Sequence, residues 1–167
     1  MYRSQRAGQS RPSYLGHVLT ENRYGLVVAA CVTQSGKRAE REAALTMLDR
    51  LKRRARHITL GADKGYQEEQ FIAGLRERQV VPHVAEYEVT SRPWPKNWLW
   101  AKERNDPGFA RSQQRRKRVE QVFGWLKHTA GLRQVKLRGR RRVEWMFQLA
   151  VAALNLRRLQ RLLPAAV

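Results

Sequence analysis

The spacing of apolar residues changes repeatedly between residues 14 and 85, and this alternation limits the folds open to the chain. Four segments have strand-like alternation or short β-branched runs, and two segments between them have helical spacing. The extended segments are Tyr14–Asn22, Leu26–Thr33, His57–Ala62 and Val80–Ala85, and the helical ones are Ala39–Arg54 and Gln67–Arg78. The first two extended segments flank the turn Arg23-Tyr24-Gly25, which predicts a hairpin whose second strand is buried on both faces. The order predicts a sheet with helices on its faces, and therefore an α/β or α+β fold.

The second half of the chain is mainly helical by the same criterion. Helical spacing is found in Gln114–Thr129 and Val143–Leu163, whereas Tyr87–Gly108, with three prolines and three tryptophans, is predicted to be a long irregular loop. Gly131–Arg142 is too basic and too rich in glycine to assign. Met1–Pro12 is basic and almost free of apolar residues, so we expect a flexible basic arm over 1–12 and one domain over 13–163.

The charge balance restricts the classes of function. The 34 Lys and Arg residues against 14 Asp and Glu give a net charge of +20, which predicts a polyanionic partner. The longest apolar run, Leu26–Val32, is well below the roughly 20 residues that span a bilayer. Cys31 is the only cysteine, which excludes an internal disulfide and a zinc site built from several cysteines. We therefore expect a cytoplasmic protein without a membrane partner.

Two carboxylates stand out against this basic background. Glu120 shares one face of the predicted helix Gln114–Thr129 with Arg116, Gly124 and Lys127, opposite an apolar face formed by Val119, Val122, Phe123 and Leu126. Its carboxylate is either the ion-pair partner of Arg116 or a metal ligand beside a phosphate-binding surface. Gly124 either admits a phosphate or eases packing.

Asp63 follows the predicted strand His57–Ala62 directly. An aspartate in this position is commonly a turn former or a helix N-cap, and the carboxyl end of a strand is also where sheet proteins bind ligands. If Asp63 and Glu120 share one site among lysines and arginines, a hard divalent cation completed by substrate phosphate is the expected chemistry.

Several motifs, in the same order along the chain, resemble the DDE transposases of insertion sequences. They are Tyr14-Leu15-Gly16-His17, Glu21-Asn22-Arg23, Gly25-Leu26-Val27-Val28, Ala39-Glu40-Arg41-Glu42-Ala43-Ala44, Gly61-Ala62-Asp63-Lys64-Gly65-Tyr66, the segment from Arg116 to Lys127, and Asn155-Leu156-Arg157-Arg158-Leu159. The resemblance covers nearly all of the chain after residue 13. It implies a ribonuclease-H-like mixed sheet flanked by helices, truncated at its N-terminal strand, with two Mg²⁺ ions held by three acids. The implied function is DNA transposition, by metal-dependent strand cleavage and strand transfer at insertion-sequence ends, in a nucleoid-associated homo-oligomer.

The resemblance also implies roles for individual residues. Asp63 matches the second catalytic, metal-binding acid of the family and Glu120 the third. The family signature of Tyr, two residues, Arg, three residues, Glu, six residues and Lys is matched by Arg116, Glu120 and Lys127, with Gln113 in the place of the tyrosine. Arg116 and Lys127 are implied to bind phosphates of the transposon ends. The other DNA-binding candidates are Lys64, Arg115, Lys117, Arg118, Arg138, Arg140, Arg141 and Arg142.

The first acid of the family has no counterpart, because no aspartate precedes Asp49. Asp49 lies within a predicted helix, and Glu21, near a strand end, is a poor substitute. We therefore expect a split or truncated transposase with little activity alone, completed by an upstream polypeptide, or else an inactive remnant that only binds DNA. Composition alone also permits an RNA-binding protein.

Arg111–Arg142 holds twelve Lys or Arg and one acid, so we expect salt-sensitive DNA binding. The tryptophans Trp94, Trp98 and Trp100 either stack on bases or cover a core.

Overall fold

The chain forms two compact units. The computed structural model describes residues 14–36, 38–51, 58–87 and 98–163. Unit 1 comprises residues 1–51 and 119–167, and unit 2 comprises residues 52–118. Unit 1 is therefore assembled from the two ends of the sequence, and unit 2 from its continuous middle. The predicted basic arm lies outside the described residues, and the single domain over 13–163 stays a prediction.

Unit 1 contains the predicted hairpin. Strands β1 (Tyr14–Thr20) and β2 (Val27–Gln34) pair antiparallel, with Gly16 opposite Val32. Gly25 has a φ of 77°, a conformation that glycine adopts without steric cost. The Glu21 carboxylate accepts hydrogen bonds from the backbone N–H groups of Arg23, Tyr24 and Leu26 at 2.6, 2.7 and 2.9 Å. These bonds fix the turn, and the hairpin prediction is confirmed.

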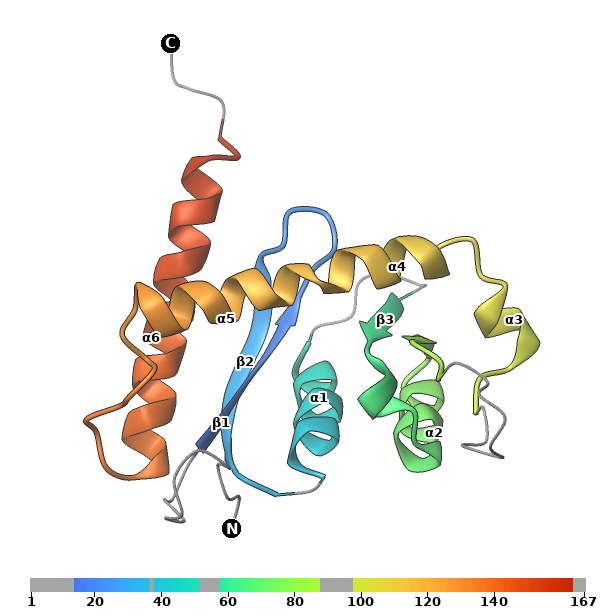
Figure 1. Ribbon diagram of the computed structural model, residues 1–167, viewed down its shortest axis with the longest axis horizontal. Coiled ribbons are helices and arrows are strands. Elements are labelled where there is room, and N and C mark those ends of the chain that lie inside the picture. Colours follow the sequence, from blue (N-terminus) through green and yellow to red (C-terminus); the bar gives the residue numbers. More distant parts are fainter. Residues whose placement is uncertain (1–13, 37, 52–57, 88–97, 164–167) are drawn as a thin grey trace. The chain divides into compact units, whose positions relative to one another are not determined.

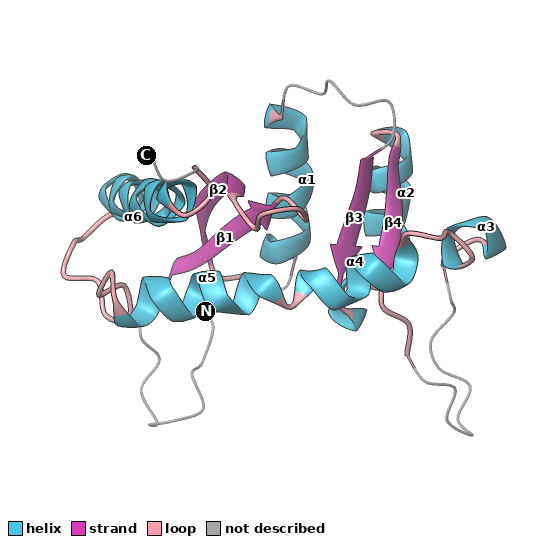
Figure 2. Ribbon diagram, turned by 90° about the horizontal axis from the view of Figure 1, so that it is seen from above, coloured by secondary structure: helices cyan, strands magenta, loops and turns pink. Residues whose placement is uncertain are grey.

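Two helices cover opposite faces of this hairpin, α1 (Ala39–Arg50) on one and α6 (Arg140–Gln160) on the other (Figure 1, Figure 2). Cys31 packs with Met47 of α1, whereas its neighbour Val32 belongs to the core cluster that contains Phe147 of α6. Successive side chains of a strand point to opposite faces, so β2 is buried on both faces at this point, as predicted. A Cβ on Gly16 would lie 2.6 Å from Phe147 Cε2, so a glycine is needed where α6 crosses the hairpin.

Helix α5 (Arg118–His128) completes the core of unit 1. Val122 and Leu126 are fully buried and belong to the same cluster as Val143 and Phe147. Phe123 is only partly buried and packs against the edge of that cluster. The predicted apolar face of this helix is therefore confirmed, with Leu126 rather than Phe123 at its centre.

Unit 2 is a parallel β-α-β arrangement. Strands β3 (Ile58–Ala62) and β4 (Val80–Val84) pair in parallel, and the 3₁₀ helix η1 (Lys64–Tyr66) and helix α2 (Glu69–Glu77) connect them. Helix α2 buries Phe71, Ile72 and Leu75, the predicted apolar face. Helix α4 (Phe109–Arg116) packs on both strands, so closely that a Cβ on Gly61 would lie 3.2 Å from the Ser112 carbonyl oxygen.

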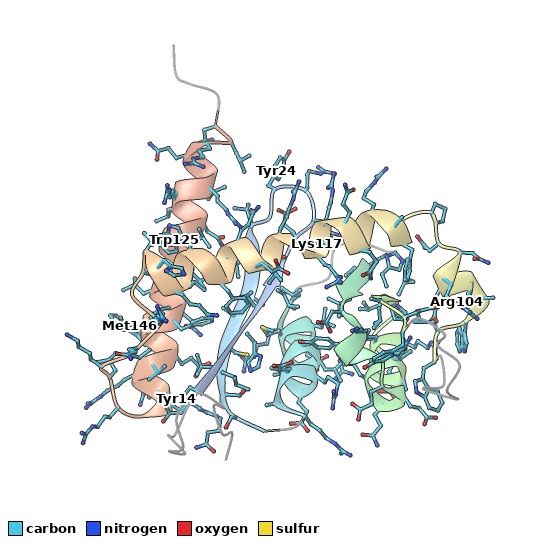
Figure 3. The ribbon with its side chains drawn as sticks, in the orientation of Figure 1. Tyr14, Tyr24, Arg104, Lys117, Trp125 and Met146 are labelled. Atoms are coloured by element: carbon cyan, nitrogen blue, oxygen red, sulfur yellow. The ribbon has the colours of Figure 1, made fainter. Side chains whose placement is uncertain are left out.

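Two sequence predictions are corrected. The helix expected over Gln114–Thr129 is two helices, α4 and α5, which meet at Lys117 (Figure 3). Four consecutive cations, Arg115–Arg118, lie at this break, and the like charges of Arg115 and Arg118, three residues apart, disfavour a continuous helix there. The loop expected over Tyr87–Gly108 contains the short helix α3 (Ala101–Arg104), while residues 88–97 of it lie outside the described part.

The fold is α/β, with two two-stranded sheets and helices in the part of the chain that the structure describes. Within those residues, no helix is both long enough and apolar enough to cross a membrane.

Candidate functional site

The carboxyl end of β3 carries the first candidate residue, Asp63. Its backbone is extended, and its Oδ1 accepts a hydrogen bond from Gly65 N–H at 2.8 Å, so the side chain caps η1. The turn-forming interpretation of Asp63 is therefore confirmed. The side chain is nevertheless exposed, and the hydrogen bond with Gly65 involves only one of its two oxygens. Capping and ligand binding are thus compatible at this residue.

A side chain from α4 joins the ends of both strands of unit 2. Gln113 Nε2 donates hydrogen bonds to the carbonyl oxygens of Ala62, at 3.3 Å, and of His83. Its Oε1 accepts a hydrogen bond from Arg116 Nε at 2.8 Å. Through these bonds the guanidinium of Arg116 is tied to the strand end from which Asp63 follows.

Sequence reasoning missed this role of Gln113, because it considered the residue only as a departure from a tyrosine. The available signal was its spacing, since residues three apart on a helix are neighbours and Gln113 precedes Arg116 by three.

Lys64 is the third charged residue at this edge. It is exposed, and its Nζ lies 5.7 Å from the centroid of the Tyr87 ring, a cation–π distance. In unit 2, three charged residues therefore lie near the carboxyl ends of β3 and β4: Asp63, Lys64 and Arg116. One carboxylate beside two cations is an arrangement that suits a metal-bound phosphate.

The remaining candidates of the family signature lie on α5, in unit 1. Glu120 is exposed in the first turn and Lys127 is exposed in the last, which matches the sign of the helix dipole at each end. A Cβ on Gly124 would meet no atom within 4 Å, so this glycine is not required for packing, and a phosphate contact there stays a prediction. Arg116 belongs to unit 2, so its ion pair with Glu120 also stays a prediction.

The basic candidates differ in their exposure. Lys117 is exposed, and Arg115, Arg116 and Arg118 are half-buried. The cluster at the start of α6 is exposed throughout: Arg138, Arg140, Arg141 and Arg142. Three of its members lie in the first turn of a helix, where cations oppose the helix dipole, so the cluster does not stabilise α6. A DNA contact by this cluster stays a prediction.

Two exposed carboxylates of the chain have the chemistry of magnesium ligands. Exposed carboxylates at Asp63 and Glu120 have the hard oxygen chemistry that Mg²⁺ prefers. Among the described residues, however, no group of three or more His, Cys, Asp or Glu side chains is positioned to hold a metal ion. Glu21 does not fill the gap, because its carboxylate is held by the hairpin turn. Although burial raises the pKa of Glu21, hydrogen bonds from the backbone of Leu26, Arg23, Tyr24 and Gly25 lower it below the usual value. Asp49 is exposed within α1.

One constellation in unit 2 has the residue types of a hydrolytic triad. His83 Nδ1 lies 2.8 Å from Ser112 Oγ, and His83 Nε2 lies 3.5 Å from Asp106 Oδ1. His83 is fully buried and Ser112 is 3% exposed. A substrate has no access to this hydroxyl, so the three side chains clamp α4 to β4 and are not an active site.

Covering a core was one of two interpretations of the tryptophans, and it is wrong for Trp100. Leu99 is buried, whereas Trp100 is 50% exposed, with the guanidinium of Arg76 3.7 Å and Lys102 Nζ 4.4 Å from its ring centroid. Trp98 is half-buried and Trp94 lies outside the described residues. Base stacking by these rings stays a prediction.

Comparison with known proteins identifies the family. The sequence profile described as transposase DDE domain matches residues 1–156. No curated protein and no solved structure gave a significant match. The match covers more than nine-tenths of the 167 residues, and DNA transposition is the activity of the matched domain. With strand-end Asp63, the Arg116–Glu120–Lys127 spacing and this match together, the chain belongs to the DDE transposase family.

Proposed function

We propose that the chain supplies two carboxylates, Asp63 and Glu120, to Mg²⁺-dependent cleavage and strand transfer of DNA at insertion-sequence ends, within a ribonuclease-H-like catalytic domain. The observation that carries the proposal is the hydrogen-bonded connection from Arg116 through Gln113 to the carboxyl end of β3. Through this connection, the guanidinium of Arg116 is hydrogen-bonded to the strand end that precedes the exposed Asp63. An arginine that acts together with an exposed carboxylate is suited to bind a DNA phosphate beside a divalent ion, and this supports the proposal.

The residues of the chain have distinct parts in this proposal. Gly65 N–H holds the Asp63 carboxylate in place through one oxygen, so that the other can bind a metal ion. Arg116 holds a phosphate of the transposon end, and Lys127 holds another on the Glu120 face of α5. Bound magnesium would supply activation of water and stabilisation of the leaving 3′ oxygen. The exposed arginines at the start of α6 follow the DNA backbone without reading its sequence.

Two carboxylates contribute a charge of −2, whereas two magnesium ions carry +4. We therefore propose that a third carboxylate comes from an upstream transposase polypeptide. The family resemblance adds that the active species is a homo-oligomer on DNA in the nucleoid.

A second candidate function is favoured by the lack of a three-residue metal group among the described residues. In that case the chain is an inactive remnant that binds DNA through its basic surface.

Cleavage of labelled DNA carrying the ends of the element tests the proposal. We expect magnesium-dependent cleavage by the wild type together with the upstream polypeptide, and loss of cleavage in Glu120→Gln. The controls are this chain alone, the upstream polypeptide alone, and the variant Glu69→Gln, which changes an exposed carboxylate of α2 and should leave cleavage intact. Cleavage that survives Glu120→Gln would overturn the proposed role of this carboxylate. Salt-sensitive binding without cleavage in any combination would establish the DNA-binding remnant.

A further inference from the structure

Helix α6 is apolar on two opposite faces. Its inner face, with Val143, Phe147, Val151 and Leu154, is buried in the core of unit 1. Its outer face carries a second apolar row, which we call the outer stripe: Trp145, Leu149, Ala152, Leu156 and Leu159. All five are exposed, and Trp145, Leu149 and Leu156 are 66, 57 and 68% exposed. A monomer rarely leaves an apolar row of this size uncovered, so the stripe marks an interface.

The spacing of the outer stripe is that of a coiled-coil seam. Its members follow one another at steps of four, three, four and three residues, and this repeat places side chains along one line that a second helix can pack against. The positions that flank the seam carry no charge: Met146, Gln148, Ala153, Asn155 and Gln160. In a chain with a net charge of +20, this neutral strip is where another basic molecule can approach without repulsion.

The length of the outer stripe indicates which helix can cover it. From Trp145 to Leu159 it occupies 15 residues, about 21 Å of helix. Among the other described helices, α1 has 12 residues and α5 has 11, and both already pack in unit 1. Helices α2 and α4 have 9 and 8 residues and are too short to cover the row. A second copy of α6 matches it in length and in chemistry, and a two-fold axis makes one row complementary to itself.

We propose that two copies of this chain associate through the outer stripe of α6, with the two helices antiparallel. Antiparallel alignment pairs Leu149 with Leu159 and the small Ala152 with Leu156, each pair occurring twice. Leu163, in the turn after the helix, falls opposite Trp145. A parallel alignment would instead leave a gap between two Ala152 residues and bring together the two exposed clusters Arg140–Arg142. The antiparallel dimer places these clusters at opposite ends, where they are free to bind DNA.

The oligomeric state in solution provides the first test. Full-length protein, treated with nuclease and kept at high salt to remove nucleic acid, is measured by sedimentation equilibrium. We expect a dimer for the wild type, and a dissociation constant raised about tenfold or more by Leu156→Glu. Leu137→Glu, at an exposed leucine outside α6, is the matched control and leaves the dimer unchanged. A monomeric wild type, or a folded Leu156→Glu variant that dimerises as the wild type does, would overturn the proposal.

Disulfide cross-linking tests the alignment without a charged substitution. Leu149→Cys and Leu159→Cys are prepared separately, and each is oxidised alone and after mixing. We expect a cross-linked dimer only in the mixture, because each cysteine faces the other position of the partner. Cross-linking of each variant with itself would establish parallel helices and overturn the alignment, and no cross-link in any sample would overturn the seam. Neither test uses DNA cleavage or metal, so this inference and the proposed function can fail independently.

Discussion

The Gln113 side chain makes three hydrogen bonds that no tyrosine could make in its place. Its amide nitrogen donates to two strand carbonyls, and its amide oxygen accepts from Arg116. A tyrosine hydroxyl has one proton and could not donate to both carbonyls. At this position the chain therefore uses the side chain for hydrogen bonding within unit 2.

Substitution of Gln113 should affect stability and DNA binding together. We expect Gln113→Ala to lower the free energy of unfolding by about 1–3 kcal/mol, because the carbonyl groups of His83 and Ala62 lose the hydrogen bonds from its amide. The Ala62 carbonyl keeps its hydrogen bond from Ala85 N–H. DNA affinity should also fall, because Arg116 is no longer oriented. Chemical denaturation and fluorescence anisotropy with labelled DNA measure the two effects. Gln114→Ala, at the exposed neighbouring position, serves as the control, and equal behaviour of the two variants would contradict the positioning role.

Glu103 makes unit 2 sensitive to acid. Its carboxylate, 5% exposed, accepts hydrogen bonds from Arg76 at 2.8 and 2.6 Å and from Trp100 N–H at 2.8 Å. Burial raises the pKa of Glu103, but the hydrogen bonds from Arg76 and Trp100, with the charges of Arg76 and Lys102, hold it below the usual 4.5. A carboxyl group whose pKa is lower in the folded state stabilises the fold above the unfolded pKa, and this stabilisation is lost as the pH falls through the folded pKa.

We therefore expect Glu103→Gln to lower the free energy of unfolding by about 3 kcal/mol at neutral pH, because it leaves the Arg76 charge partly buried without its partner. The difference from the wild type should shrink as the pH falls below 4.5. Thermal or urea unfolding across this pH range measures both. Glu77→Gln, at an exposed carboxylate of α2, should show neither effect. A pH-independent difference for Glu103→Gln would disprove the ionic contribution.

At the scale of elements, local patterns in the sequence were sufficient for most helices and strands. Each of these patterns reflects burial against a neighbouring element: the alternation in β1 and β2, and the helical spacing in α1, α2 and α6. The pattern therefore predicts the strand or helix even when the neighbour is not known. The break at Lys117 could not be predicted in this way, because no glycine or proline marks it. Helix α3 was missed for a related reason, since it depends on Glu103 meeting Arg76 from another part of the sequence. For the candidate site, pattern and resemblance predict roles for Asp63 and Glu120 that stay predictions, but the hydrogen bonds of Gln113 depend on how α4 packs on the sheet.

Burial within α5 determines which substitution there costs most. Leu126 is 1% exposed in the core of unit 1, whereas Phe123 packs at its edge. We expect Leu126→Ala to lower the free energy of unfolding by about 2–5 kcal/mol, and Phe123→Ala to cost less despite the larger side chain that it removes. Urea denaturation of both variants gives the comparison. A greater loss for Phe123→Ala would mean that the buried face of α5 is centred elsewhere.

At the scale of the whole molecule, the excess of positive charge should appear in the salt dependence of DNA binding. Each phosphate contact that is lost reduces the slope of log affinity against log salt by about 1. We therefore expect the triple substitution Arg140→Gln, Arg141→Gln and Arg142→Gln to reduce the slope by about 3. Arg157→Gln with Arg161→Gln, at exposed positions near the other end of α6, controls for the change in net charge. An equal reduction per arginine in both variants would show that the cluster has no special contact with DNA.

The construction of unit 1 from both ends of the sequence has a consequence for synthesis on the ribosome. Val27 N–H donates to Asn155 Oδ1 at 2.9 Å, and Asn155 Nδ2 donates to the Val27 carbonyl oxygen at 2.8 Å, across a separation of 128 residues. The hairpin is synthesised before the helix that covers one of its faces, so that face stays uncovered until Arg140–Gln160 has been made. Unit 2, encoded by a continuous stretch, can fold in the interval. Unit 2 can therefore fold before unit 1 is complete, and the hairpin keeps an exposed apolar face, open to aggregation, until α6 arrives.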